Sequence, residues 1–175
     1  SRPWVTGKRL GMASLGAVRE ATGRHAQRGF AMPVRYHSRG PKAEQPYTWF
    51  DSPERRAGAV DIQVVATPGG ANTLHLIDAS VLEALGPQGY LVNIARASVV
   101  DTQALVTALQ SGALAGAATD VFDDEPQLPD ALKALHNTVL TPHVAGQSPE
   151  AARDTVALVL RNLQAFFAGE PVLTP

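Results

Sequence analysis

The feature that most constrains the fold is an alternation of short apolar runs with stretches that carry helix signals. Such alternation is typical of strand–helix–strand crossovers, which build a parallel sheet with helices on both faces. The chain has 175 residues, enough for one domain with a full apolar core. We therefore predict a single-domain α/β fold with a doubly wound parallel sheet. The predicted strands are residues 8–13, 32–37, 61–67, 90–94, 113–120 and 138–141.

Helix start signals follow these apolar runs. Ser52, Asp78, Asp101 and Ser148 are residue types whose side chains accept hydrogen bonds from the first backbone N–H groups of a helix. Proline, which is favoured at the first helical position, follows both serines. The predicted helices run from residue 14 to about 28, and over residues 52–57, 78–85, 102–111, 128–135 and 148–168.

Composition argues against several classes of function. The chain is 45% hydrophobic and 18% charged with a net charge of −1, which gives no electrostatic basis for binding nucleic acid or an anionic membrane. It has no cysteine, and its five histidines have no paired spacing that suggests a metal site. There is no membrane-length apolar run and no signal peptide at the N-terminus. We expect a cytoplasmic protein and, because there is no initiator Met, a fragment of a longer one.

The segment after the first predicted strand, residues 14–19, stands where a dinucleotide-binding unit places its glycine-rich phosphate turn. Only the middle glycine of G-x-G-x-x-G is present, as Gly16, because Ser14 and Arg19 replace the outer two. The middle glycine is the one that lets the backbone approach a pyrophosphate. Taken alone, however, the segment fits an ordinary strand–turn–helix connection better than a phosphate site.

The second predicted strand ends in His37, Ser38 and Arg39, with Lys42 close behind. Enzymes that select NAD usually place an acidic residue here to bind the ribose 2′-hydroxyl. A hydroxyl and two cations suit the 2′-phosphate of NADP instead. The alternative is a solvated basic loop, which is common on protein surfaces.

Three chemically active side chains, Arg96, Glu125 and His143, follow successive predicted strands. Because carboxyl ends of parallel strands share one edge of a sheet, we expect them at one site. Arg96 can bind a carboxylate through two parallel hydrogen bonds. A carboxylate beside His143 favours the protonated ring and fixes its tautomer. His143 can then donate a proton to a ketone oxygen as hydride reaches the carbon, which fits reduction of a 2-keto acid.

Three motifs, at residues 92–101, 120–126 and 141–146, resemble in sequence and order those of the D-isomer-specific 2-hydroxyacid dehydrogenases. The chain is most similar to their NADP-preferring glyoxylate, hydroxypyruvate and hydroxyphenylpyruvate reductases, over nearly all of residues 7–175. The resemblance implies a Rossmann-type dinucleotide-binding domain over residues 1–147. It also implies that residues 148–175 are a helix and tail that return to a substrate domain missing from this chain. Ala97 departs from the glycine that is common in the family.

The resemblance also implies roles for individual residues. Arg96 would be the substrate clamp, His143 the acid/base and Glu125 its partner. The implied cofactor is NADP, with NAD as the alternative. The residues expected along the cofactor are Ser14, Leu15, Gly16, Ala17, Val18, Ser38, Arg39, Lys42, Thr67, Pro68, Gly69, Thr73, Ile94, Ala95, Arg96, Asp120, His143, Ala145 and Gly146.

We therefore expect an oxidoreductase that transfers a hydride between NADP(H) and a small 2-keto or 2-hydroxy acid, and the family implies a homodimer. The isolated chain should be inactive because half of the cleft is missing. A non-catalytic dinucleotide sensor or corepressor is the main alternative; the degenerate glycine turn favours it, and retention of the three chemical residues opposes it. A formate or phosphite dehydrogenase ranks lower, because a formate enzyme would be expected to carry glutamine in place of Glu125.

Overall fold

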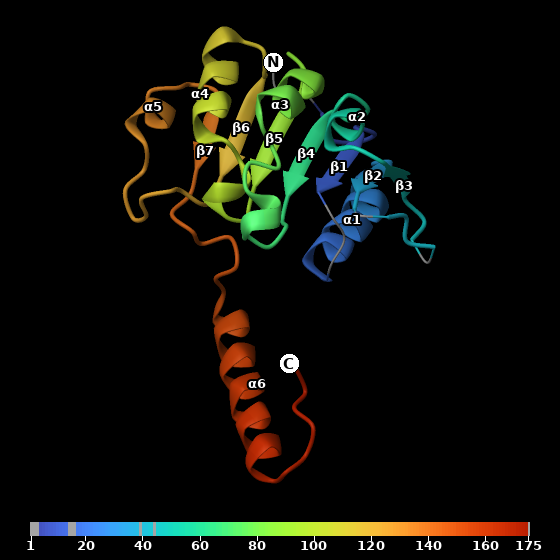
Figure 1. Ribbon diagram of the computed structural model, residues 1–175, viewed down its shortest axis with the longest axis vertical. Coiled ribbons are helices and arrows are strands. Elements are labelled where there is room, and N and C mark those ends of the chain that lie inside the picture. The colour runs from blue at the N-terminus through green and yellow to red at the C-terminus, as the bar shows by residue number, and fades with distance from the viewer. Residues whose placement is uncertain (1–3, 14–16, 39, 44, 175) are drawn as a thin grey trace. The chain divides into compact units, whose positions relative to one another are not determined.

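The computed structural model describes residues 4–13, 17–38, 40–43 and 45–174. In this part of the chain, seven parallel strands form one sheet in the order β3-β2-β1-β4-β5-β6-β7 (Figure 1). The order reverses at β1, which pairs with both β2 and β4, and the predicted doubly wound fold is confirmed. The strands are β1 (Leu10–Ala13), β2 (Val34–His37), β3 (Thr48–Phe50), β4 (Ile62–Val65), β5 (Tyr90–Asn93), β6 (Gly116–Thr119) and β7 (Thr138–Leu140).

Helices follow the strands where the sequence predicts them, and all four expected N-caps are confirmed. Asp78 and Asp101 each accept a hydrogen bond at 3.0 Å from the backbone N–H three residues on. Ser52 and Ser148 do the same at 3.1 and 3.0 Å. The helices are α1 (Ala17–Phe30), α2 (Pro53–Ala57), α3 (Ala79–Leu85), α4 (Thr102–Ser111), α5 (Asp130–Lys133) and α6 (Pro149–Phe167), with short 3-10 turns η1 (Ala71–Thr73) and η2 (Ala97–Val99).

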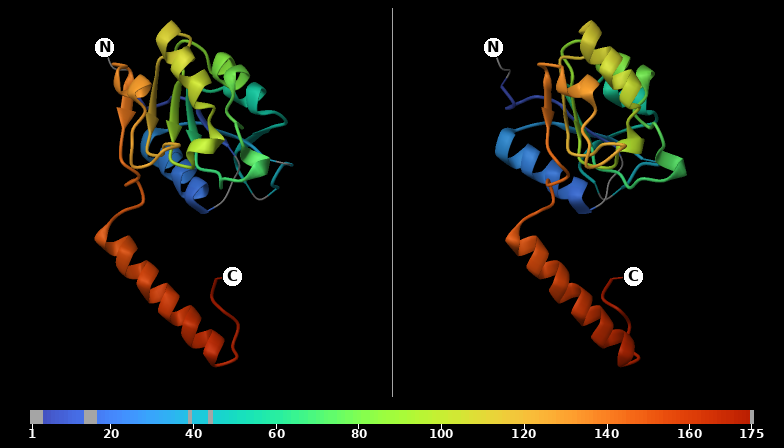
Figure 2. Two further views of the ribbon diagram at one scale, coloured as in Figure 1. Left: turned by 60° about the vertical axis from the view of Figure 1, so that its left-hand side comes forward. Right: turned by 90° about the vertical axis from the view of Figure 1, so that its left-hand side faces the viewer.

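Helices cover both faces of the sheet, with α1 on one side and α3 and α4 on the other (Figure 2). Successive side chains of β4 show the division, because Val64 packs into the apolar cluster that includes α1, and Val65 into the larger cluster of α2, α3 and α4. The central strands of the sheet are therefore buried between two apolar layers, which leaves the strand ends to carry the polar chemistry.

One strand was missed by the sequence prediction. β3, at the edge of the sheet beside β2, has only three residues, and none of their side chains is fully buried. Thr48, Trp49 and Phe50 are too few to give a recognisable apolar run. Their assignment depends on pairing with Arg35, Tyr36 and His37, which is a tertiary feature.

The chain divides into two compact units, residues 1–142 and 143–175. The dinucleotide-binding domain predicted from the sequence extends to residue 147. The structure therefore places three residues of that predicted domain, His143, Ala145 and Gly146, in the second unit. The backbone N–H of Thr141 still donates to the carbonyl of Thr119 at 3.1 Å, so β7 is bound to the sheet almost up to the boundary. Within the described ranges, no helix combines the length and the apolar character needed to cross a bilayer.

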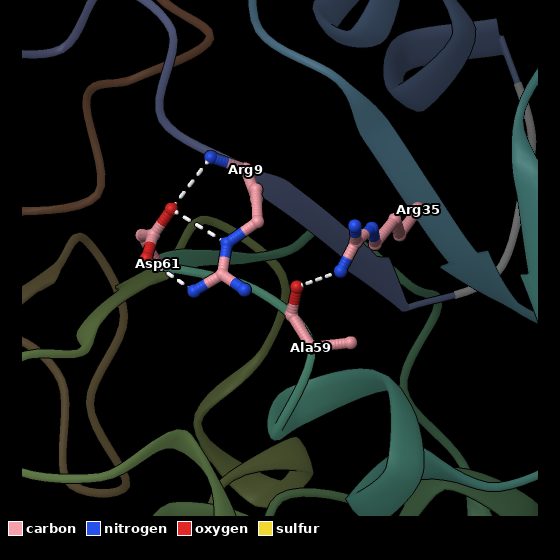
Figure 3. A network of polar contacts seen from close by, with 4 residues as sticks. All are labelled: Arg9, Arg35, Ala59 and Asp61. Atoms are coloured by element: carbon pink, nitrogen blue, oxygen red, sulfur yellow. Dashed lines mark hydrogen bonds and ion pairs between the residues drawn. The ribbon is translucent and has the colours of Figure 1, made fainter.

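Arg9 and Asp61, the residues directly before β1 and β4 in the chain, form an ion pair (Figure 3). Nε and Nη2 of Arg9 donate to the two carboxylate oxygens at 3.0 and 2.6 Å, and the Arg9 backbone N–H donates at 2.8 Å. Beside the pair, Arg35 of β2 donates to the carbonyl of Ala59. Hydrogen bonds from Arg9 lower the pKa of Asp61 from 3.8 to about 2. This network links the amino ends of three adjacent strands.

We expect Asp61→Asn to lower the free energy of unfolding by about 1 kcal/mol at neutral pH, a modest value because Arg9 is partly exposed. The pKa of Asp61 is lower in the folded protein, so the pair stabilises the fold above about pH 4 and loses this effect as pH falls toward 2. Urea unfolding of both proteins at several pH values measures the difference. A difference that stays constant down to pH 2 would contradict this assignment.

Candidate functional site

A cleft of about 840 Å³ opens beyond the carboxyl ends of β2 and β4. These strands flank β1, where the strand order reverses and where ligands bind in open α/β sheets. One wall consists of His37, Ser38, Gly40 and Lys42, and the other of residues 67–73 with Leu76. The cleft therefore brings together Ser38, Lys42, Thr67, Pro68, Gly69 and Thr73, six of the residues expected along the cofactor.

The loop after β4 presents bare backbone to this cleft. Gly69 and Gly70 lack side chains, and Gly70 has a φ of 134°, which other residues rarely adopt. The hydroxyl of Thr73 lies 2.8 Å from the carbonyl oxygen of Pro68 and 3.1 Å from that of Gly70, so it restrains the turn. A dinucleotide needs a wall that its phosphates and sugars can approach closely, and this loop fits that need.

Arg96, three residues after the end of β5, lies beside the same loop. A methyl group placed on Gly69 would come within 3.0 Å of Cγ and 3.4 Å of Cβ of Arg96. The aliphatic stem of Arg96 therefore packs over the backbone of Gly69. Its Nη1 donates to the carbonyl of Ala95 at 2.7 Å, and the residue as a whole is exposed. The arginine predicted to bind a carboxylate thus lies next to a loop that lines the cleft.

Sequence reasoning missed Asn93, which shapes the turn that presents Arg96. Asn93 is buried at the end of β5. Its Oδ1 accepts the backbone N–H of Ala95 at 3.0 Å, and its Nδ2 donates to the carbonyl of Arg96 at 3.3 Å. An amide in an apolar strand, three residues before the arginine, was the available signal. Ala95 is buried in this turn and Ile94 is half-buried.

Two of the predicted site residues, both of them carboxylates, follow the carboxyl end of β6. Asp120 is 4% exposed, and its Oδ1 accepts a hydrogen bond from the Thr141 hydroxyl at 2.5 Å, which joins the ends of β6 and β7. Glu125 is exposed, and its Oε1 accepts the backbone N–H of Phe122 at 3.0 Å. The described strands are all parallel, so the carboxyl end of β6 lies at the same edge of the sheet as the cleft. Both carboxylates follow this strand end.

His143 opens the second compact unit and has a φ of 55°, in the left-handed region that few non-glycine residues occupy. Its carbonyl accepts a hydrogen bond from Nε2 of Gln147 at 3.2 Å. The backbone N–H of Gln147 also donates to Val144, which closes a turn around Ala145 and Gly146. Strained backbone of this kind concentrates at functional sites.

Other residues expected along the cofactor lie at the start of the chain. Ser14, Leu15, Gly16 and Arg39 fall outside the described residues. Ala17 and Val18 open α1, and the Val18 side chain is 61% exposed. Over the described ranges, no group of acidic or histidine side chains is placed to hold a metal ion.

Known proteins resemble this chain in sequence and in fold. Residues 2–145 match the family model of the D-isomer specific 2-hydroxyacid dehydrogenase, NAD binding domain. Hydroxyphenylpyruvate reductase from Plectranthus scutellarioides is 43% identical over 170 residues, which cover 97% of this chain and 54% of that protein. Glyoxylate/hydroxypyruvate reductase A from Arabidopsis thaliana is 41% identical, with the same shares covered.

Solved structures agree with the sequence matches. The NADPH-dependent glyoxylate/hydroxypyruvate reductase from Sinorhizobium meliloti, in complex with NADP and malonate, has a TM-score of 0.91 and 42% identity, over 97% of this chain and 53% of that one. The holo form of Rhodotorula graminis D-mandelate dehydrogenase has a TM-score of 0.95 and 32% identity, over 100% and 52%. The chain spans about half the length of the relatives that it matches. It belongs to the D-isomer-specific 2-hydroxyacid dehydrogenase family, as the NAD-binding domain.

Proposed function

We propose that this chain is the cofactor-binding half of an NADP(H)-linked reductase of small 2-keto acids, of the glyoxylate or hydroxypyruvate type. The observation that carries the proposal is the cleft between the loop after β2 and the Pro68–Gly70 turn, with Arg96 against that turn. The Sinorhizobium meliloti relative, solved with NADP and the dicarboxylate malonate, supports both the cofactor and a carboxylate substrate.

In this proposal, Arg96 binds the carboxylate of the keto acid through two parallel hydrogen bonds. Asn93 holds the turn on which Arg96 stands, and Gly69 leaves room for the arginine stem. A planar guanidinium fixes the orientation of a carboxylate, and so it fixes the direction in which the adjacent carbonyl carbon faces. This positioning is the contribution that Arg96 makes to the rate.

When bound, NADPH supplies the hydride that reduces the carbonyl carbon. The protonated ring of His143 donates its proton to the ketone oxygen, so that negative charge does not accumulate there. Glu125 is the proposed partner that favours the charged ring and sets its tautomer. In the direction of oxidation, neutral His143 accepts the proton of the substrate hydroxyl. Each turnover, in either direction, transfers one hydride and one proton.

We also propose a substrate-binding domain beyond this chain, the homodimer that the family suggests, and a cytoplasmic location. The apolar side chains of α6 support a further protein surface, because Val156, Val159, Leu160, Leu163 and Phe166 are each about half exposed or more. An apolar stripe of this size on one helix usually marks an interface. The dinucleotide-binding part is proposed as residues 1–147 and the returning helix and tail as residues 148–175.

Cofactor choice gives a direct test. We expect the chain to bind NADPH more tightly than NADH, and Arg39→Ala to weaken NADPH binding about 10- to 100-fold, as expected for a lost charge-assisted contact of roughly 1.5–3 kcal/mol. Binding of NADH should change little. Calorimetric titration with both cofactors measures this. Arg24→Ala, which removes an exposed arginine of α1, is the control. Equal affinity of the parent chain for the two cofactors would contradict the assignment of NADP.

A second candidate function is dinucleotide sensing without catalysis, which the replacement of two turn glycines by Ser14 and Arg19 favours. Turnover distinguishes the two functions. A protein that contains this chain and a substrate domain should oxidise NADPH in the presence of glyoxylate or hydroxypyruvate. Binding of NADPH with no oxidation of it would favour the sensor.

A further inference from the structure

We infer that Tyr36 and Trp49 are positioning residues that hold the loop after β2 in the shape that recognises a 2′-phosphate. The inference rests on the proposed function, because it concerns the same cofactor cleft. Selectivity for NADP then depends on two aromatic side chains that support the loop, in addition to the cations of the loop itself.

Tyr36 is a core residue with a polar end. It is 1% exposed, and its ring belongs to the apolar cluster on the α1 side of the sheet, with Leu10, Met12 and Val34. Its hydroxyl oxygen accepts the backbone N–H of Lys42 at 2.7 Å. Phenylalanine would fill the same apolar space, so the hydroxyl serves the loop and not the core. Because the ring is immobilised by packing, Tyr36 gives Lys42 a fixed anchor.

Trp49 anchors the other end of the loop. It lies in β3, which pairs with β2, and its indole Nε1 donates to the carbonyl of Ser38 at 3.2 Å. The Ser38 hydroxyl donates to the carbonyl of Gly40 at 2.6 Å, which tightens the turn between the two anchors. Ser38, Gly40 and Lys42 all line the cleft. The wall of the cleft is therefore tied to the core at both Ser38 and Lys42.

Anchoring of the loop affects the binding of a phosphate more than the binding of other groups of a nucleotide. A phosphate is bound by several donors at once, and the affinity falls when those donors must be ordered at the moment of binding. In the proposed function, the wall formed by Ser38, Gly40 and Lys42 is assigned to the 2′-phosphate alone. Loss of either anchor should therefore weaken binding of a 2′-phosphate and leave the rest of the nucleotide unaffected.

Two nucleotide fragments separate these effects. We expect the 175-residue chain to bind 2′,5′-ADP, which carries the 2′-phosphate, more tightly than 5′-AMP, which lacks it. Tyr36→Phe and Trp49→Phe should each raise the Kd of 2′,5′-ADP about 2- to 10-fold, the effect of one lost hydrogen bond, and leave the Kd of 5′-AMP within about twofold. Calorimetric titration gives both constants. Tyr47→Phe is the matched control, because Tyr47 packs against the same apolar cluster.

The ratio of the two Kd values decides the outcome, because a purely structural defect weakens both fragments equally. If the parent chain prefers 2′,5′-ADP and Tyr36→Phe leaves that preference unchanged, the inference is overturned and the proposed function stands. If the parent chain binds the two fragments equally, the inference and the proposed function are both overturned. Should Trp49→Phe fail to fold, as a melting curve would reveal, the Tyr36→Phe ratio alone decides.

Discussion

Replacement of His143 by Asn is expected to lower keto-acid turnover about 10²- to 10⁴-fold in a protein that combines this chain with a substrate domain. Asparagine can still hydrogen-bond to the ketone oxygen, but it cannot deliver a proton as the hydride arrives. Affinity for NADPH should change little, because the proton donor acts on the substrate. Absorbance of NADPH during glyoxylate reduction gives the rate, and titration of NADPH gives the affinity.

Asparagine is the suitable replacement because of the backbone at this position. His143 has a φ of 55°, and asparagine is among the few residues that tolerate the left-handed region. The variant therefore removes the ring without straining the turn. His136→Asn, at an exposed histidine in the turn before β7, is the control and should keep full activity. Full activity in the His143 variant, or an equal loss in the His136 variant, would remove His143 from the chemistry.

The second large effect concerns stability. Arg56 of α2 is 0% exposed, and Nε, Nη1 and Nη2 have no hydrogen-bond partner among the described residues. Burial lowers the pKa of this guanidinium from its ordinary value to about 10, with Glu54 partly opposing the change. A buried charge without hydrogen bonds costs several kcal/mol, and methionine fills a similar volume without that cost. We expect Arg56→Met to raise the free energy of unfolding by roughly 1–4 kcal/mol.

Arg55→Met provides a matched control in the same short helix. Arg55 is 69% exposed and forms an ion pair with Asp51 at 2.6 Å, so its replacement should change the free energy of unfolding by less than about 0.5 kcal/mol. Urea and thermal unfolding of both variants measure the two effects. Destabilisation by Arg56→Met with a neutral Arg55→Met would show that the guanidinium makes stabilising polar contacts.

The sign of the pH dependence follows from the same burial. Because the pKa of Arg56 is about 10 in the folded chain, below its ordinary value, the folded protein releases this proton before the unfolded chain as pH rises. The contribution of Arg56 to stability therefore becomes more favourable between these two values. Arg56→Met should lack that increase, and comparison of the two proteins at pH 9 and above isolates it.

Much of the fold and of the candidate site could be predicted from local signals. Apolar runs mark six of the seven described strands, because a strand of a parallel sheet is buried on both faces. Capping residues mark helix starts, because they satisfy backbone N–H groups next to them in sequence. Once the strands are known to be parallel, Arg96 and Glu125 must follow carboxyl ends at one edge. To place Arg96 and Glu125 after strands at this edge therefore required no knowledge of side-chain packing.

Contacts between residues distant in sequence were decided only by the tertiary structure. The sequence predicts a short helix over residues 52–57, but it does not predict that packing of α2 against the sheet and α3 buries one of its two arginines. The stem of Arg96 crosses Gly69, and the hydroxyl of Tyr36 binds Lys42. Trp49 holds Ser38 from a strand too short to recognise. Sequence periodicity reports which face of an element is apolar, but these contacts depend on which elements the fold brings together.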